Sequence, residues 1–219
     1  MKVISVLNQK GGAGKTTIAT QLARALQISG SSVLLVDSDP QGSARDWAAV
    51  REDQPLSVVG IDRPTIERDL RSVANMHYVI IDGAPQAHDL AVSAIKASDL
   101  ILIPVTPSPY DLWATDALVE LVRQRIEITN GGLRAAFVIS RAIKNTRIRA
   151  EIADALSNYG LPILESRVTQ RVIYPETAAL GTTVLDLDPT GDAAIEICSL
   201  ANEAQMMVNS STHLSKVPA

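Results

Sequence analysis

Cysteine and aromatic side chains are scarce in this sequence, and each scarcity excludes a class of protein. One cysteine among 219 residues, Cys198, excludes an intramolecular disulfide framework and a Cys-rich metal site built by a single chain. Aromatic residues make up 3% although hydrophobic residues make up 46%, so the core has to consist mainly of aliphatic side chains. This composition is typical of a buried parallel sheet between helices. We expect Cys198 to be a small buried residue on a helix, because Ile195 and Ile197 lie beside it.

Long apolar runs are also missing. The longest, such as Leu100–Val105, have the length of a strand and fall far short of the roughly 20 residues that a membrane span needs. The N-terminal residues lack the apolar stretch of a secretory signal peptide. The segment Met206–Ala219 carries one lysine and one histidine and presents no amphipathic membrane-binding face. We therefore expect a cytoplasmic protein that does not bind membranes.

Charge is unevenly distributed along the chain. The net charge is −4, but the segment from Arg123 to Arg171 holds nine Lys or Arg residues and four Asp or Glu residues. Such a basic segment favours contact with a polyanion. An ordinary solvated helical face explains the same pattern equally well, and both interpretations stay open.

Short apolar runs alternate with helical patterns along the chain. The runs that indicate strands are Lys2–Leu7, Val33–Val36, Tyr78–Ile81, Leu100–Val105 and Ala135–Ile139. The helical patterns are Thr16–Ser29, Ser43–Arg51, Thr65–Ala74, Ala87–Ala97, Asp111–Thr129, Thr146–Tyr159 and Asp192–Met207. Continuous apolar strands that alternate with helices predict an α/β fold, a doubly wound, mostly parallel twisted sheet with helices on both faces. We expect one domain over residues 1–208 and a disordered tail over residues 209–219.

The first predicted strand leads into a glycine-rich loop. After Gln9 its residues are Lys10, Gly11, Gly12, Ala13, Gly14, Lys15, Thr16 and Thr17. Small residues let the backbone curl so that its N–H groups point at phosphate oxygens, and the following helix adds its positive end. In such loops the lysine corresponding to Lys15 reaches the β- and γ-phosphates, and the Thr16 hydroxyl ligates Mg²⁺. Lys10–Thr17 is therefore expected to bind a nucleoside triphosphate, most simply ATP, with Mg²⁺.

The loop departs from the common G-x-x-x-x-G-K-S/T pattern in two ways. Gln9 stands at the first glycine position, and a second lysine, Lys10, precedes the glycine pair. The form K-G-G-x-G-K-T-T resembles the deviant Walker A loop of the ParA/MinD superfamily of P-loop ATPases. The resemblance implies that Lys10 reaches across a dimer interface to the partner's bound phosphates, as an arginine finger would.

Two carboxylates follow the second predicted strand. Because side chains alternate along a strand, Asp37 and Asp39 lie on one side of its tip, where ligands bind in open α/β sheets. The segment resembles the D-x-D-P-Q of ParA proteins. That match implies that Asp39 orients or activates the attacking water and contributes to the metal site, and that Asp37 supports the water and metal network. The alternative is a turn or helix-capping aspartate, which also fits Asp39 before Pro40.

Asp82 ends another apolar run, Tyr78–Ile81, as the aspartate of a Walker B strand does. Its carboxylate is expected to hold Mg²⁺ together with Thr16, directly or through water. Further along, the stiff segment around Pro107 and the end of the strand at Arg141 are candidate nucleotide contacts. The first of these resembles a segment that borders the nucleotide in the small ParF-like plasmid partition ATPases.

The resemblance extends from Lys2 to about Met207. It implies an ATP-bound homodimer that binds nonspecific DNA on the nucleoid, and a ParB/ParG-like centromere-binding or cargo adaptor protein that stimulates slow ATP hydrolysis. The chain begins at the first strand, so we expect no operator-reading extension. Expected DNA-phosphate contacts are Arg171 first, then Arg167, Arg147 and Arg149.

Plasmid or chromosome segregation is the function that this resemblance favours. A protein assembly as cargo, a MinD-like membrane switch and an ATP-dependent biosynthetic enzyme of the same fold are the alternatives. The membrane switch is disfavoured by the absence of an amphipathic tail, and no motif for a biosynthetic substrate is evident.

Overall fold

The computed structural model describes residues 1–53, 55–73, 75–85, 88–108, 113–142 and 154–210. Its centre is a seven-stranded sheet in the order β3-β2-β4-β1-β5-β6-β7, and every neighbouring pair is parallel. The strands are β1 (Lys2–Val6), β2 (Val33–Asp37), β3 (Ser57–Gly60), β4 (Tyr78–Asp82), β5 (Leu100–Val105), β6 (Arg134–Ala142) and β7 (Ile163–Thr169). The predicted α/β fold with a parallel sheet is confirmed.

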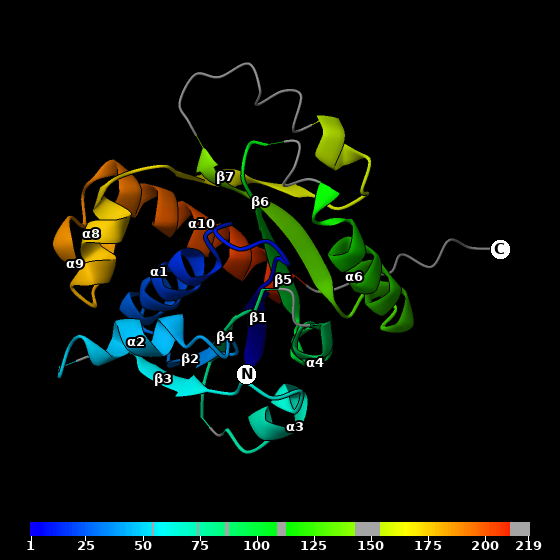
Figure 1. The fold of residues 1–219 in the computed structure, drawn as a ribbon, viewed down its shortest axis with the longest axis horizontal. Helices are drawn as coiled ribbons and strands as arrows, with labels where there is room; N and C mark the ends of the chain where they lie inside the picture. Colours follow the sequence, from blue (N-terminus) through cyan, green and yellow to red (C-terminus); the bar gives the residue numbers. More distant parts are fainter. Residues whose placement is uncertain (54, 74, 86–87, 109–112, 143–153, 211–219) are drawn as a thin grey trace.

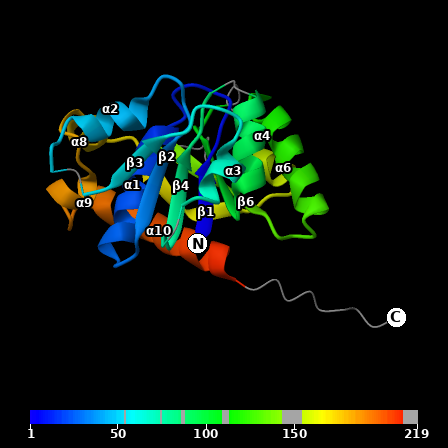
Figure 2. The same cartoon turned by 90° about the horizontal axis from the view of Figure 1, so that it is seen from below.

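Helices cover both faces of this sheet (Figures 1 and 2). They are α1 (Lys15–Ile28), α2 (Ser43–Ala49), α3 (Ile66–Leu70), α4 (His88–Ala97), α6 (Asp116–Ile128), α8 (Ile173–Ala179), α9 (Val184–Leu187) and α10 (Asp192–Asn209). One face packs mainly on α1 and α10, and the other packs on α3, α4 and α6. Alternate residues of each strand enter opposite layers, as Ile80 and Ile81 do in β4. Both layers are almost entirely aliphatic, as the composition requires.

Two strands and two helices were not predicted. β3 is a four-residue edge strand whose side chains are largely exposed, and β7 mixes buried with exposed positions. Neither segment therefore contains a continuous apolar run. Pro175 interrupts the helical pattern of α8, and α9 has only four residues, so neither segment shows a helical period. Most of the predicted helix Thr146–Tyr159, and residues 211–219 of the predicted tail, lie outside the described residues.

Cys198 lies on a helix as expected, but the expectation that it is buried is wrong, because its side chain is exposed. Successive residues of a helix are about 100° apart, and the inner face of α10 is formed by residues such as Ala194, Ile197 and Ala201. Cys198 lies on the outer face together with Ile195, which is 57% exposed. Within the described residues, no helix is both long and apolar enough to span a bilayer.

Candidate nucleotide site

The glycine-rich loop connects β1 to α1 and has the tight curvature that the sequence predicts. Gly12 and Gly14 have φ angles of 76° and 89°, a left-handed conformation that residues with a Cβ rarely adopt. A Cβ added to Gly14 would lie 2.6 Å from Oγ of Ser140. The loop therefore requires glycine at this position for its backbone angle and for its approach to β6, and α1 begins directly after it at Lys15.

Asn8 anchors the start of the loop, a role that the motif alone did not reveal. Its buried amide donates a hydrogen bond to the carbonyl oxygen of Pro104 at 2.7 Å, and its Oδ1 accepts one from the N–H of Lys10 at 2.9 Å. The side chain thus joins the ends of β1 and β5 to the loop. A polar residue directly after a buried strand is the sequence signal that could have identified it.

Lys15 is buried at the base of the loop. Its side chain is 7% exposed, and its ammonium group donates a hydrogen bond to the carbonyl oxygen of Lys10 at 2.9 Å. Burial lowers the pKa of Lys15, whereas the nearby carboxylates of Asp82 and Asp39 act to raise it. An ammonium group has three N–H donors, so Lys15 retains donors that could form hydrogen bonds to a phosphate oxygen.

Asp82 ends β4 and lies next to Asp37 in the sheet register. It is 1% exposed, and neither carboxylate oxygen accepts a hydrogen bond from the residues that the structure describes. Burial raises the pKa of Asp82 to about 7. The Thr16 hydroxyl, which lies near the carboxylate without the geometry of a hydrogen bond, and Lys15 act to lower this pKa, whereas Asp37 and Asp39 act to raise it. A buried carboxylate without a partner is costly unless a cation or proton satisfies it. Asp82 and Thr16 therefore fit the predicted Mg²⁺ site.

Asp37 is fully buried, and its carboxylate supports local structure. It accepts hydrogen bonds from the backbone N–H groups of Asp39 at 3.0 Å, Ala44 at 3.0 Å and Arg45 at 2.9 Å. Two of these groups belong to the first turn of α2, where N–H groups have no partner within the helix. Asp37 thus stabilises the N-terminus of α2. Its predicted part in the water and metal network stays a prediction.

Asp39 faces the nucleotide cleft and also forms a turn. Its Oδ1 accepts a hydrogen bond from the N–H of Gln41 at 2.9 Å, which is the turn geometry that the sequence left open. Asp39 lines the same cavity as Lys15 and Thr16. The turn and the proposed catalytic role are therefore compatible, because the second carboxylate oxygen is not part of that turn.

A cavity of about 1170 Å³ lies between the loop and the ends of β6 and β7. It brings together Thr17, Asp39, Arg141 and Arg171 with the glycines of the loop. The Arg141 guanidinium donates a hydrogen bond to the carbonyl oxygen of Gly12 at 3.2 Å. Of the described candidates, six are not among the residues that line it: Lys10, Ala13, Asp37, Asp82, Pro107 and Arg167. Arg147 and Arg149 lie outside the described residues.

Arg171, the first candidate for a DNA contact, is held by acidic groups of its own chain. Its guanidinium donates hydrogen bonds to Glu196 at 2.7 Å, to Asp192 at 3.1 Å and to the Thr169 hydroxyl at 2.7 Å. The hydrogen bond to Glu196 is the main reason that the pKa of Arg171 is raised. The charge of this one arginine of the basic segment is thus balanced by acidic side chains of α10.

Comparison with known proteins identifies related chains over almost the full length. A family model described as the CobQ/CobB/MinD/ParA nucleotide binding domain matches residues 4–192. Maintenance of carboxysome distribution protein A of Halothiobacillus neapolitanus is 32% identical over 206 residues, covering 91% of this chain and 94% of the relative. Sporulation initiation inhibitor protein Soj of Bacillus subtilis is 26% identical and covers 92% and 97%. The septum site-determining protein MinD of Pyrococcus horikoshii, solved with Mg-ADP, superposes with a TM-score of 0.73 at 18% identity, covering 95% of this chain and 97% of that one.

Proposed function

The chain belongs to the CobQ/CobB/MinD/ParA nucleotide-binding family, and we propose that it is a Mg²⁺-dependent ATPase that positions a cargo in the cell. The observation that carries this proposal is the buried pair of Lys15 and Asp82 beside the glycine loop. One is a desolvated ammonium group, and the other is a carboxylate without a hydrogen-bond partner among the described residues. The charge of Lys15 complements a triphosphate, and the charge of Asp82 complements the metal ion that accompanies it.

Each residue of the site has a distinct role in the proposed hydrolysis of ATP. The N–H groups of the loop and Lys15 bind and orient the phosphates. Asp82 and Thr16 would hold Mg²⁺, which would neutralise phosphate charge when bound. Asp39 accepts a hydrogen bond from the attacking water and orients it. Lys10 does not line the cavity of its own chain, which suits a role at the phosphates of a second copy in an ATP-bound homodimer.

The cargo is a separate question from the chemistry. The carboxysome distribution protein is 32% identical to this chain, whereas Soj is 26% identical, so the comparison favours a protein assembly over a plasmid or chromosome. We therefore place the protein-cargo alternative first and DNA segregation second. In either case the model requires nonspecific DNA as a track and an adaptor protein, ParB/ParG-like or cargo-bound, that stimulates hydrolysis.

The proposal is tested by binding to random-sequence duplex DNA with ATP, with ADP and without nucleotide, across a salt series. We expect binding with ATP only, no sequence preference, and an affinity that falls steeply with salt because phosphate contacts release counterions. Lys15→Ala is the matched control, since it should lose the ATP-dependent binding and retain its fold.

Absence of DNA binding by a folded, ATP-bound protein would contradict the nucleoid-track model. Binding to anionic lipid vesicles in the same assay would favour a membrane switch instead. ATP turnover that depends on a small-molecule acceptor, with neither DNA nor lipid binding, would favour a biosynthetic enzyme.

A further inference from the structure

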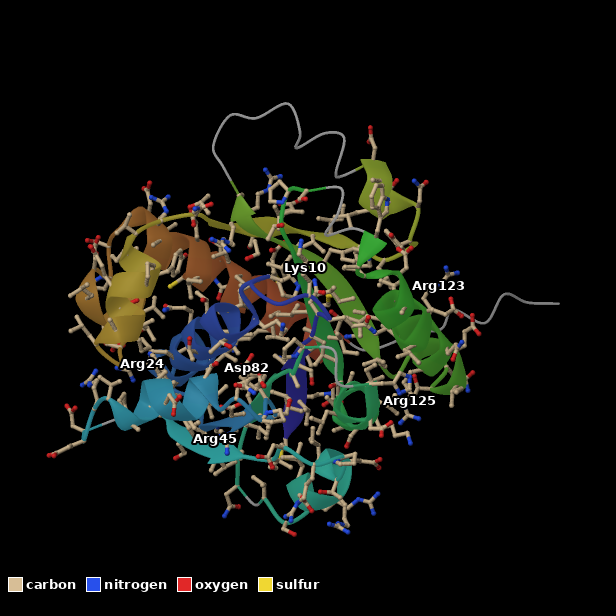
Figure 3. All side chains as sticks on the ribbon, viewed as in Figure 1. Lys10, Arg24, Arg45, Asp82, Arg123 and Arg125 are labelled. Carbon is tan, nitrogen blue, oxygen red and sulfur yellow. The ribbon has the colours of Figure 1, made fainter. Side chains whose placement is uncertain are left out.

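Arg45 projects from α2 toward the end of β2 and contacts the backbone of Asp39. Its Nη2 donates a hydrogen bond to the Asp39 carbonyl oxygen at 3.0 Å, and the N–H of Gly42 donates to the same oxygen at 2.9 Å. Figure 3 places Arg45 beside α2 and β3, well away from Lys10 on the loop. The side chain therefore contacts the backbone of the proposed catalytic residue from outside the nucleotide cleft.

Two glycines leave room for the Arg45 side chain. A Cβ added to Gly60 would lie 2.8 Å from Nη1 and 2.9 Å from Cδ of Arg45, and one added to Gly42 would lie 3.2 Å from Nη2. Distances below 3.0 Å are closer than van der Waals contact allows, so the guanidinium occupies the space that a side chain at position 60 would need. The guanidinium thus lies against the backbone of both glycines, although the Arg45 side chain is 37% exposed.

Acidic groups hold the same guanidinium electrostatically. Its Nε lies 3.5 Å from the buried Oδ2 of Asp37, and its Nη2 lies 3.6 Å from Oδ2 of Asp62, whose side chain is 47% exposed. Arg45 thus connects three segments: the end of β2, the start of α2 and the residues after β3. The Asp37–Gln41 turn, which presents Asp39 to the cleft, is braced by this connection.

We propose that Arg45 is a positioning residue that holds the Asp39 turn in the geometry needed to orient the attacking water. This inference rests on the proposed ATPase function and on the role of Asp39 in it. Arg45 is not among the residues that line the nucleotide cavity, so it would act through the backbone of Asp39 and contribute little to nucleotide binding. Small displacements of a catalytic group lower the rate of the chemical step far more than they lower substrate affinity.

The experiment measures kcat and KM for ATP, and Tm without nucleotide, for wild type, Arg45→Ala and Arg45→Lys. We expect kcat of Arg45→Ala to fall by about tenfold or more with KM within about twofold of wild type, and Arg45→Lys to be intermediate. The matched control is Arg24→Ala, because Arg24 is also an ion-paired arginine, bound to Asp186 at 2.6 Å. That variant should keep the wild-type kcat even if its Tm falls.

Gly60→Ala tests the same idea without removing a charge. The backbone of Gly60 is not in the left-handed region, so the new Cβ should chiefly displace the Arg45 guanidinium. We expect a lower kcat, an unchanged KM and a Tm close to that of wild type. This variant also decides the matter if Arg45→Ala does not fold.

Wild-type kcat in folded Arg45→Ala, or in Gly60→Ala where the former does not fold, would overturn the inference, as would a parallel rise of KM. Asp39→Ala separates this failure from failure of the proposed function. If Asp39→Ala abolishes turnover and the Arg45 and Gly60 variants do not affect it, only the positioning role is wrong. If wild type does not hydrolyse ATP, or Asp39→Ala is fully active, the underlying function is wrong.

Discussion

The two sides of the nucleotide cleft differ in how their charges are balanced. On the loop side, the buried carboxylate of Asp82 accepts no hydrogen bond from the described residues, and Lys15 is desolvated beside it. On the side of β7 and α10, Arg171 is bound by both Glu196 and Asp192. The first arrangement is incomplete without a ligand, whereas the second is complete within the chain.

This difference predicts that substitutions on the two sides of the cleft affect different properties of the protein. A buried charge with an incomplete set of partners lowers the stability of the free protein and is relieved when a ligand binds. A charge that is paired within the fold contributes to stability and must give up those partners to bind anything else. Substitutions on the loop side should therefore change ligand binding, and substitutions on the β7–α10 side should first change stability.

The largest effect is expected at Lys15. Lys15→Ala removes the ammonium group that we propose to bind the phosphates, so ATP affinity should fall by about a hundredfold or more. The Tm of the nucleotide-free protein should stay the same or rise, because a desolvated charge has been removed. Calorimetric titration with Mg-ATP and thermal unfolding measure the two quantities. A lower Tm with full ATP affinity would show that Lys15 stabilises the fold and does not bind ATP, which contradicts the account of this side.

Asp82 should make the stability of the nucleotide-free protein depend on pH. Because burial raises its pKa in the folded state to about 7, the folded protein binds a proton more tightly than the unfolded chain does. Stability should thus decrease as the pH rises from about 4 to about 7, where the unfolded chain has released this proton and the folded protein still holds it, and should level off above about 7. In Asp82→Asn this component should be absent, and Mg²⁺-dependent turnover should be lost. Identical pH profiles of Tm for wild type and Asp82→Asn would contradict the raised pKa of Asp82.

Arg171 should behave in the opposite way. Arg171→Gln removes the guanidinium that forms ion pairs with Glu196 and Asp192, so Tm should fall by roughly 3–6 °C. Arg125→Gln is the matched control, because Arg125 is a half-buried arginine whose guanidinium donates only a long hydrogen bond of 3.4 Å, to the carbonyl oxygen of Lys96, among those described. A wild-type Tm for Arg171→Gln combined with loss of DNA binding would show instead that Arg171 is a ligand contact, and would break the comparison.

The smallest effect is expected at Tyr174, which lines the cleft near Arg171 and Glu196 and is 7% exposed. Its hydroxyl is buried and makes no hydrogen bond within the described part of the chain. Tyr174→Phe should therefore leave Tm unchanged or raise it by about 1–2 °C, since no hydrogen bond is lost. Thermal unfolding without nucleotide checks this expectation. A marked decrease in Tm would mean that the hydroxyl is paired in the folded protein.

The sequence predicted the loop side better than the other side, for a physical reason. Strands such as β1 and β4 are continuous apolar runs, and Lys15 and Thr16 follow β1 within a short motif, so local patterns contain the information. The role of Asp37 at the N-terminus of α2 depends on residues seven and eight positions away. The pairing of Arg171 with Glu196 spans 25 positions and depends on how α10 packs on β7. No local pattern encodes such a contact.

The most direct test of the account is Mg²⁺-dependent phosphate release from ATP by wild type, Lys15→Ala and Asp39→Ala. The account predicts slow turnover by wild type that requires Mg²⁺, no turnover by Lys15→Ala because ATP is not bound, and none by Asp39→Ala although ATP is bound. Wild type that binds Mg-ATP without hydrolysing it, or Asp39→Ala that hydrolyses ATP at the wild-type rate, would contradict it.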